Sequence, residues 1–399
     1  MYLNLAVLFG FTLAYSLLAG RLERTPVAGP LLFTAFGALA GPFGLGLLHL
    51  DIEAEGLRLL AELTLALVLF TDAASANLGV LRRNLGLPER LLLLGLPLTV
   101  LLGLGAALLL FPGLGFVAAA LLATMLAPTD AALGKAVVAN PAVPAPIREG
   151  LNVESGLNDG ICVPLLLALL ATAAEEAHTG GTVALLARHF VEALGIGAVV
   201  GLGLAWAATQ VMRLGAARGW LDDTWRQLPV IALALTSFAL AQALGGSGFI
   251  ACFAGGILAG AMARRHKHEQ LLAAEGAGDL LSLLTWVVFG AAVVGQGVGR
   301  LTPPIIAYAV LSLTVVRMLP VWLALAGTTL RPAEKLFVGW FGPRGLASVV
   351  FAVLVLDADV PGSDTLIATV ACTVVLSIVL HGLSAGPLAA RLAGSGRTG

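Results

Sequence analysis

Charged residues are scarce in this sequence. Asp, Glu, Lys and Arg make up 11% of its 399 residues, against about 25% in a typical soluble globular domain. The mean hydropathy is +0.98 and 59% of the residues are hydrophobic. This composition excludes an ordinary soluble domain and predicts an all-α polytopic membrane protein.

Cysteine is also rare. Cys162, Cys252 and Cys372 fall in three separate apolar stretches and lack the spacing of metal ligands, so we interpret them as small packing residues and expect no cofactor. The one dense basic stretch, RRHKHEQ at 264–270, is too short to indicate nucleic-acid binding. We interpret its His266 and His268 as parts of a solvated loop.

Long apolar runs are what the sequence has instead. A bilayer core about 30 Å thick requires about 20 helical residues per crossing, and such runs recur along the whole chain. We therefore predict about thirteen transmembrane helices. They are expected at 3–20, 31–49, 59–78, 91–111, 115–138, 149–173, 183–211, 227–244, 248–263, 279–298, 304–326, 333–356 and 365–390.

The distribution of basic residues predicts the orientation, because Lys and Arg concentrate in cytoplasmic loops. An outside N-terminus places sixteen Lys and Arg residues inside, and only Arg58, Arg188 and Arg300 outside. The C-terminus is then cytoplasmic, which requires an odd number of spans. The first run lacks the features of a cleaved signal peptide, so we expect it to be retained.

Several ionisable residues fall within the expected spans, where each costs at least about 2.5–3.5 kcal/mol to insert. The basic ones are Lys135, Arg317 and Arg344, and the acidic ones include Asp72, Asp130, Glu154 and Asp159. Such residues usually pair with one another, face an aqueous cavity or mark an ion pathway.

The sixth expected span carries the polar sequence ESGLNDG at 154–160. On a helix, Ser155 and Asp159 share one face because they are four residues apart. Glu154 and Asn158 point about 100° away from that face. One face is therefore suited to hold an ion and the other to brace the helix.

Two expected spans contain helix-breaking residues at membrane depth. Pro128 interrupts the fifth span, and Gly342-Pro343-Arg344-Gly345 interrupts the twelfth. Non-helical backbone at that depth lines a cavity, where carbonyl, hydroxyl and carboxylate oxygens replace the water around a small cation. A broken helix in each half indicates a transporter built from inverted repeats.

The expected arrangement is a single transmembrane domain over 1–399 with two repeats. The first repeat is 1–173, the linking span is 183–211 and the second repeat is 227–391. The pentapeptides GALAG at 37–41 and GILAG at 256–260 lie seven spans apart, as do the two breaks. This shared offset supports the internal repeat.

These motifs resemble those of the NhaP-type sodium/proton antiporters, the bacterial relatives of the eukaryotic sodium/proton exchangers. The resemblance covers nearly the whole chain. It rests on Pro-Thr-Asp at 128–130, Glu-Ser-x-x-Asn-Asp at 154–159, GSGFIACFAGGILAG at 246–260 and Gly-Pro-Arg-Gly at 342–345. It implies a secondary transporter, not an enzyme, that works by alternating access with two broken, crossing helices. It also implies a homodimer in a bacterial inner membrane.

The resemblance further implies a role for individual residues. Asp159 looks like the carboxylate that binds sodium and protons in turn, and Thr129, Asp130 and Ser155 look like its neighbours around the ion. Asp72 stands where family members often place an acid that reaches the ion indirectly.

The resemblance also implies supporting roles for other residues. Glu154 resembles the structural acid of the family, with Arg317 as its favoured partner over Arg344. Asn158, where a second acid could stand, resembles the branch regarded as electroneutral. Ala131 replaces a proline found in many members, and Lys135 has no assigned role beyond reaching for the cytoplasmic interface.

A hypothesis for how cation and proton transport are coupled can be stated from physical chemistry alone. Desolvation favours the protonated form of a carboxylate, so a proton and a cation compete for one buried acid. If only the loaded forms of the cavity change sides, each turnover exchanges one ion for the other. Sodium is the expected cation, with lithium and potassium as alternatives.

Some alternatives stay open at this stage. Asp130 could cap the amides of a broken helix, and Arg344 could hold a broken-helix carbonyl. A transporter of the same architecture could instead carry an organic anion with sodium. A remote alternative is an intramembrane aspartyl protease, because Gly276-Ala277-Gly278-Asp279 matches the pattern GxGD. We interpret Asp279 as an N-cap at the start of the tenth span.

Overall fold

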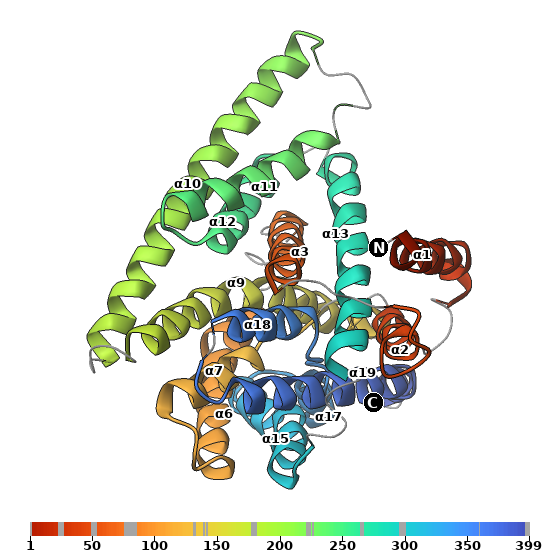
Figure 1. Ribbon diagram of the computed structural model, residues 1–399, viewed down its shortest axis with the longest axis vertical. Coiled ribbons are helices and arrows are strands. Elements are labelled where there is room, and N and C mark those ends of the chain that lie inside the picture. The colour runs from red at the N-terminus through yellow and green to blue at the C-terminus, as the bar shows by residue number, and fades with distance from the viewer. Residues whose placement is uncertain are drawn as a thin grey trace. The chain divides into compact units, whose positions relative to one another are not determined.

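The fold is taken from a computed structural model of the chain. It describes residues 2–22, 28–48, 54–75, 86–130, 133–138, 140, 143–176, 182–220, 225, 227–263, 267–294, 301–358 and 360–395. Within these residues every regular element is a helix (Figure 1).

The chain forms two compact units. The first unit consists of Met1–Arg58, Asn84–Ser155 and Ser282–Gly399, and the second of Leu59–Arg83 and Gly156–Leu281. Each unit therefore combines residues from both halves of the sequence. The division into the repeats 1–173 and 227–391 is a different one and stays a prediction.

The first unit contains most of the helices. They are α1 (Tyr2–Leu22), α2 (Gly29–Ala40), α5 (Gly86–Arg90), the π-helical turn η1 (Leu91–Gly95), α6 (Leu96–Leu110), α7 (Phe116–Met125), α8 (Lys135–Val138), the π-helical turn η2 (Gly290–Val294), α15 (Pro303–Leu313), α16 (Val315–Ala324), α17 (Pro332–Trp340), α18 (Leu346–Asp357) and α19 (Ser363–Ser395).

Three helices run through both units and three lie in the second unit alone. The shared ones are α3 (Ala54–Ser75), α9 (Ala145–Glu176) and α13 (Lys267–Phe289). The second unit adds α10 (Thr182–Ala217), α11 (Leu228–Ala243) and α12 (Gly248–Met262).

The expected membrane class agrees with the lengths of these helices. Seven helical stretches among the described residues are long and apolar enough to cross a bilayer, and five shorter helices are also apolar. The all-helical class is thereby confirmed, whereas the number of thirteen crossings stays a prediction.

The expected breaks in spans five and twelve are present. The first helix of span five ends at Met125 and the next begins at Lys135. In span twelve, α17 ends at Trp340 and α18 begins at Leu346, with non-helical backbone between them. Pro128 and Pro343 lie inside the two gaps, as their missing amide hydrogens require.

Three expected spans differ from the observed helices. The run 31–49 stops being helical at Ala40, and residues 41–48 turn back with hydrogen bonds to the end of α2. The run 304–326 is divided at Thr314, whose backbone leaves the helical region. The helix expected at 279–298 begins earlier, at Lys267. Asp279 therefore lies inside α13, and its interpretation as an N-cap was wrong.

Some expectations concern residues that the structure leaves undescribed. Ala131, His266, the side chain of Lys135 and the side chain of His268 lie outside the described part of the chain. Cys162 and Cys252 are buried free cysteines, and Cys372 is partly buried. The packing role expected for the first two agrees with their burial.

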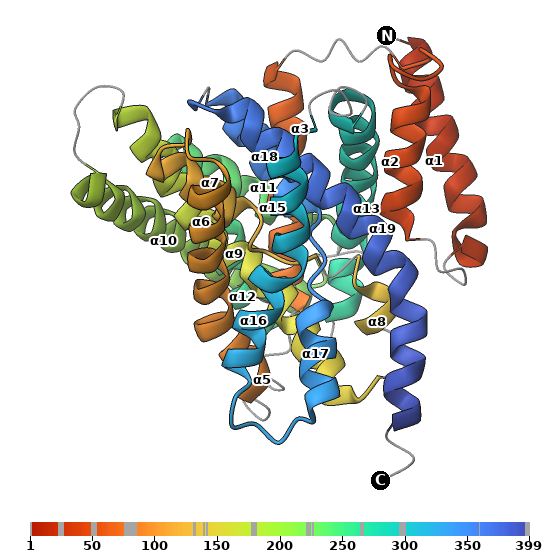
Figure 2. The ribbon, with the colours of Figure 1, turned by 90° about the horizontal axis from the view of Figure 1, so that it is seen from below.

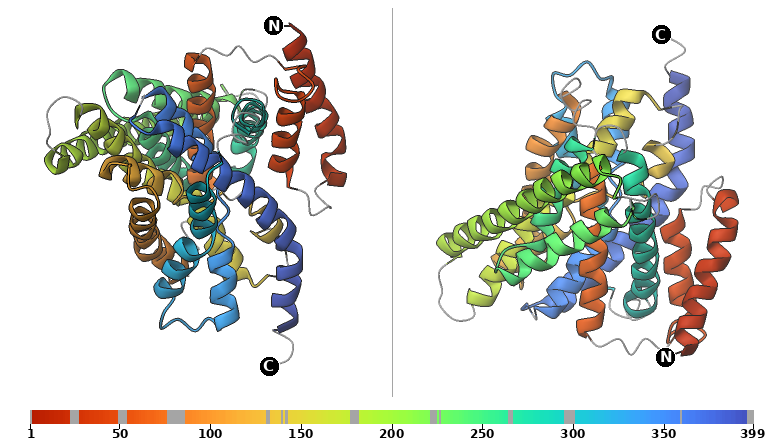
Figure 3. Two further views of the ribbon diagram at one scale, coloured as in Figure 1. Left: turned by 60° about the horizontal axis from the view of Figure 1, so that its bottom comes forward. Right: turned by 90° about the horizontal axis from the view of Figure 1, so that it is seen from above.

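In the second unit, α10 packs along α11 and α12 (Figure 3). The glycines of the GILAG pentapeptide let α12 approach α3 closely. A Cβ atom added at Gly256 would overlap the backbone of Phe70, and one at Gly260 would overlap the backbone of Ala74. Small residues four apart are a common device for close helix packing in membranes.

In the first unit, the glycines of the GALAG pentapeptide likewise allow α2 to approach a neighbouring helix closely. A Cβ atom at Gly37 would overlap the carbonyl of Val287, and one at Gly41 would press on Ala291. The other side of α2 faces α1 (Figure 2). The rings of Phe11 and Phe36 stack there with their centroids 3.9 Å apart. Span two thus packs on span ten, while span nine packs on span three. This pairing agrees with the offset of seven spans, while the repeat itself stays a prediction.

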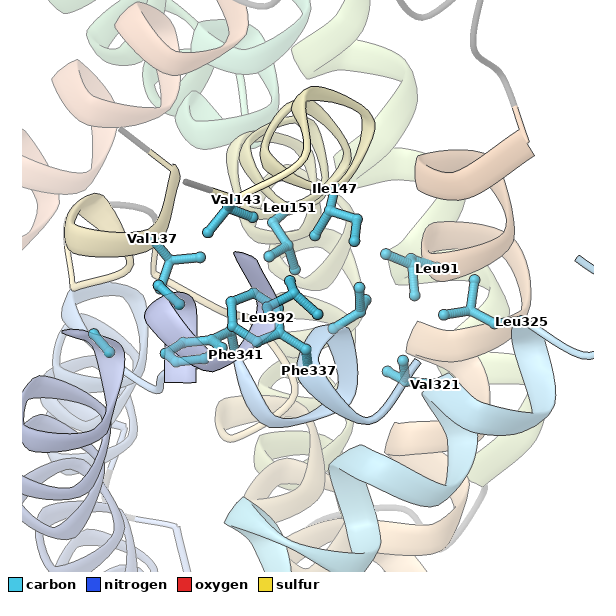
Figure 4. Close-up of a cluster of buried hydrophobic side chains, with 13 residues drawn as sticks. Leu91, Val137, Val143, Ile147, Leu151, Val321, Leu325, Phe337, Phe341 and Leu392 are labelled. Atoms are coloured by element: carbon cyan, nitrogen blue, oxygen red, sulfur yellow. The ribbon is translucent and has the colours of Figure 1, made fainter. Parts of the chain in front are cut away.

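A cluster of buried apolar side chains fixes the ends of several helices in the first unit. Val137 of α8, Ile147 and Leu151 of α9, and Phe337 of α17 meet there with Leu392 of α19 (Figure 4). The cluster therefore joins one half of each broken helix to the first turns of α9. These contacts hold the two breaks in place.

Candidate functional site

The two broken segments meet in the first unit. The backbone N–H of Asp130 donates to the carbonyl of Pro343 at 2.8 Å. Each segment has left the helical conformation at this point, so its backbone groups need partners from elsewhere. The expected crossing of two broken helices is therefore present.

Asp130 accepts backbone hydrogen bonds from both segments. Its Oδ1 accepts the N–H of Leu133 at 3.1 Å, and its Oδ2 accepts the N–H of Leu346 at 2.8 Å. The second bond caps the N-terminus of α18, where the helix dipole favours a negative charge. Gly345 makes room for this contact, because a Cβ atom there would overlap the carboxylate.

Arg344 performs the complementary task for the first break. Its guanidinium donates to the carbonyls of Ala127 and Pro128, just after the end of α7. A positive charge is favourable at the C-terminal end of a helix. Ser348 adds a bond from its hydroxyl to the carbonyl of Met125 at 2.7 Å. Each broken segment thus satisfies the open helix end of the other.

Glu154 and Arg317, which we expected to pair, form a bidentate salt bridge. Two guanidinium nitrogens lie 2.6 and 2.8 Å from the two carboxylate oxygens. Both side chains are only 1% exposed. The guanidinium also lies against Gly342, where a Cβ atom would overlap it. The pair neutralises two buried charges and lines the second break.

The two hydroxyls expected near the ion are in direct contact. Thr129 Oγ1 and Ser155 Oγ lie 2.9 Å apart, and both residues are buried. Thr129 belongs to the first break, and Ser155 lies on α9 one residue after Glu154. Two hydroxyl oxygens therefore lie together at the first break, and hydroxyl oxygens are suitable ligands for a small hard cation.

The other two expected ion-site residues belong to the second unit. Asp159 lies on α9, one turn after Ser155, and its side chain is partly exposed. Asp72 of α3 is also partly exposed and faces α9, because a Cβ atom added at Gly156 would lie 3.8 Å from the Cβ of Asp72. Asn158 is fully buried. Asp72 thus lies beside the stretch of α9 that carries Asp159.

Sequence reasoning passed over three polar residues that the structure buries. Ser377 and His381 of α19 contact the second break, and Glu62 of α3 is 8% exposed. Glu62 could have been noticed as an acid inside an expected span. Ser377 and His381 are single polar residues in an apolar run, so their spacing gave no signal.

Comparisons with known proteins agree with this arrangement. The sequence profile of the family described as "Sodium/hydrogen exchanger, transmembrane" matches residues 8–391. The K(+)/H(+) antiporter NhaP2 of Shewanella sp. (strain ANA-3) is 26% identical over 91% of this chain, and the K(+)/H(+) antiporter NhaP of Alkalimonas amylolytica is 26% identical over 97%. The chain spans 62% and 66% of the lengths of these two relatives.

The fold is similar to that of a solved structure. The sodium proton antiporter MjNhaP1 from Methanocaldococcus jannaschii superposes with a TM-score of 0.79 at 21% sequence identity. The superposition covers 98% of each chain. The similarity of fold therefore extends over nearly the whole chain.

Proposed function

The chain belongs to the sodium/hydrogen exchanger family, and from this premise we propose that it exchanges a monovalent cation for protons across a membrane by alternating access. The observation that carries the proposal is the division of work among the acids of α9. Glu154 is neutralised by Arg317, whereas Asp159 is a partly exposed acid on the face that carries Ser155. Asp159 is thus suited to bind one ion and release it in exchange for another.

The proposed mechanism is competition for the carboxylate of Asp159. A desolvated carboxylate favours its protonated form, and a cation that displaces the proton restores a neutral site. An empty charged site is costly to move through a low-dielectric interior, so only the two loaded forms change sides. Each complete cycle then exchanges one cation for one proton.

The proposed cation shell is the set of residues that the family resemblance implies, namely Asp159, Asp130, Ser155 and Thr129. Thr129 and Ser155 already place two hydroxyls 2.9 Å apart, and the unwound backbone beside them presents carbonyls. Asp130 contributes its charge next to these oxygens while its own oxygens accept backbone amides. Asp72 acts from α3 without being the main ligand.

We propose sodium as the first cation, with lithium and potassium as alternatives. The relatives above are named for potassium and the solved structure for sodium, so the name of a relative does not decide the question. Exchange is proposed to be electroneutral because Asn158, beside Asp159, carries no charge. Insensitivity of the rate to an imposed membrane potential is the expected result.

We also propose a homodimer in a bacterial inner membrane, with the N-terminus outside and the C-terminus cytoplasmic. The basic residues of the loops support the orientation. Contact with lipid is supported by α1, which buries none of its residues and leaves Leu17 77% exposed. Labelling of single cysteines placed in the loops of intact cells would test the orientation.

The experiment that tests the function uses purified protein in liposomes with a preset pH gradient. Addition of sodium, lithium or potassium salts is expected to dissipate the gradient, with a rank order that identifies the cation. Asp159→Asn is the control, because it keeps the shape of the side chain and removes its charge.

Either of two results would contradict the proposal. One is an equal response of Asp159→Asn and native protein. The other is no response to any cation from well-folded native protein over a broad pH range, which would favour sodium-coupled transport of an organic anion. Against that alternative, Arg317 is engaged by Glu154, and Arg344 by backbone carbonyls.

A further inference from the structure

The end of α17 depends on α19 for its hydrogen bonds. The last carbonyls of a helix have no partner within it, and here the chain continues as the buried segment 341–345. The carbonyl of Trp340 accepts the N–H of Gly342 at 2.8 Å and also lies 2.9 Å from Nε2 of His381. His381 is only 2% exposed, so this contact is shielded from water.

The other end of the same segment is held one turn earlier on α19. The backbone N–H of Arg344 donates to Oγ of Ser377 at 2.7 Å. Ser377 is fully buried, and its Oγ lies 3.2 Å from Nδ1 of His381. The two α19 side chains therefore touch each other and both ends of the break.

Both ring nitrogens of His381 lie beside acceptors. Nε2 lies 2.9 Å from the carbonyl of Trp340, and Nδ1 lies 2.9 Å from the backbone carbonyl of Ser377 and 3.2 Å from its Oγ. A carbonyl can only accept, so the contact with Trp340 requires a proton on Nε2, whereas a proton on Nδ1 serves Ser377 of the same helix. The Oγ of Ser377 accepts the N–H of Arg344. Ser377 and His381 together thus bridge Arg344 and Trp340 across the break.

Aromatic packing fixes the direction of the imidazole. The ring of Trp340 lies 5.1 Å from that of His381, and the ring of Phe341 lies 6.3 Å away. The indole N–H of Trp340 is itself anchored on Ser384 of α19 at 2.9 Å. A ring held in this way presents Nε2 to one carbonyl only.

We propose that Ser377 and His381 are positioning residues for transport, and this inference rests on the function proposed above. They hold 341–345 in the shape that brings Arg344 to the carbonyls of the first break and places Gly345 beside Asp130. Neither residue belongs to the proposed cation shell. Their influence on transport passes through the geometry of the crossing.

The first test measures hydrogen–deuterium exchange of the peptide that covers 341–348 in detergent. Ser377→Ala removes the acceptor of the Arg344 amide, and His381→Phe keeps a ring but removes both nitrogens. Ser377→Ala is expected to raise exchange in this peptide about tenfold or more, because the buried amide of Arg344 loses its partner. His381→Phe is also expected to raise exchange, because the carbonyl of Trp340 loses its donor and the segment is held less firmly. Thr373→Val is the matched control. Thr373 is equally buried on α19, but its hydroxyl bonds only within its own helix, to the carbonyl of Thr369.

The second test measures cation-driven proton exchange in liposomes with the same variants. Ser377→Ala and His381→Phe are expected to lower kcat/KM for the cation about tenfold, whereas Thr373→Val is expected to match native protein. His381→Gln places an amide N–H close to the position of Nε2 and should recover most of the loss. His381→Asn places its amide near Nδ1 and should not.

The outcomes separate the two proposals. Native-like labelling and native-like transport in Ser377→Ala and His381→Phe would overturn the positioning role. Equal activity of His381→Gln and His381→Phe would overturn the assigned role of Nε2. If native protein exchanges no cation at all, the proposed function fails, but the labelling experiment still decides whether α19 holds the break.

Discussion

Glu154 and Asp159 lie five residues apart on one helix, and the structure gives them opposite surroundings. Glu154 is 1% exposed and is bound by two nitrogens of Arg317. Asp159 is partly exposed, one turn beyond Ser155. The same chemical group therefore serves once as a permanently compensated charge and, as proposed, once as an exchangeable ion site. Position on the helix, and not residue type, decides between the two.

Asp130 represents a third situation. Its carboxylate accepts two backbone amides, one of them at the start of α18, where the helix dipole favours a negative charge. Capping by amides leaves the carboxylate partly exposed beside Thr129. The three acids thus form a series from full pairing to capping to exchange, and substitutions can test each step.

The largest effect on stability is expected from Glu154→Gln. The substitution leaves the charge of Arg317 buried without its partner, and breaking a buried pair costs about 3–5 kcal/mol. We expect a matching fall in the midpoint of unfolding in detergent, whereas Asp159→Asn should leave the midpoint near that of native protein.

The double variant Glu154→Gln with Arg317→Met is the control for this prediction. It removes both charges and is expected to recover much of the lost stability. Equal midpoints for Glu154→Gln and Asp159→Asn would show that the two acids do not differ as described.

A smaller loss is expected from Gly345→Ala, which tests whether Asp130 needs its place beside the second break. The added methyl group would overlap the carboxylate. Overpacking of this kind costs about 1–3 kcal/mol. Unfolding in detergent and cation-driven proton exchange in liposomes should both be impaired. Gly105→Ala is a matched control, because nothing lies within 4 Å of a Cβ atom at Gly105.

Asp130→Asn separates capping from charge. The amide oxygen can still accept one N–H, but a hydrogen bond to a charged acceptor contributes about 1–2 kcal/mol more than a neutral one. We expect a loss of that size in the free energy of unfolding. Unchanged stability with complete loss of transport would instead indicate that Asp130 acts on the ion alone.

The smallest effect is expected from Thr129→Val. It removes one hydroxyl of the pair with Ser155 and should weaken cation binding by about 0.5–1.5 kcal/mol, seen as a several-fold rise in KM for the cation. Thr124→Val is the matched control. Thr124 is also buried on the same span, but its hydroxyl bonds only to the carbonyl of Ala120 in its own helix. Equal KM values for the two variants would exclude Thr129 from the ion shell.

Much of the site was predictable because the cost of burying charge limits the alternatives. Prolines and glycines within apolar runs located both breaks. The cost of placing the charge of Glu154 inside a span indicated that it pairs with one of the basic residues inside the spans. The choice of Arg317 over Arg344 followed from the resemblance, and the bidentate contact agrees with it.

Other features depended on distances that the sequence does not contain. Nothing in Pro-Thr-Asp indicates that Asp130 accepts an amide from residue 346. His381 stands alone in an apolar helix, and such a residue has no spacing pattern to reveal its partners. The interruption at Thr314 was missed because no proline or glycine lies at that point of the run.

The reciprocal capping of the two breaks has a consequence for the order in which the protein is made. Asp130 and the amide that it caps at Leu346 are 216 residues apart in the sequence. The ribosome therefore delivers the first broken helix to the membrane long before its partner exists. Until the later segment arrives, the acid and the carbonyls after α7 must be satisfied by water or by the insertion machinery. Completion of the proposed ion site is thus a late event in biosynthesis, and truncated chains are expected to be recognised as unfinished and degraded.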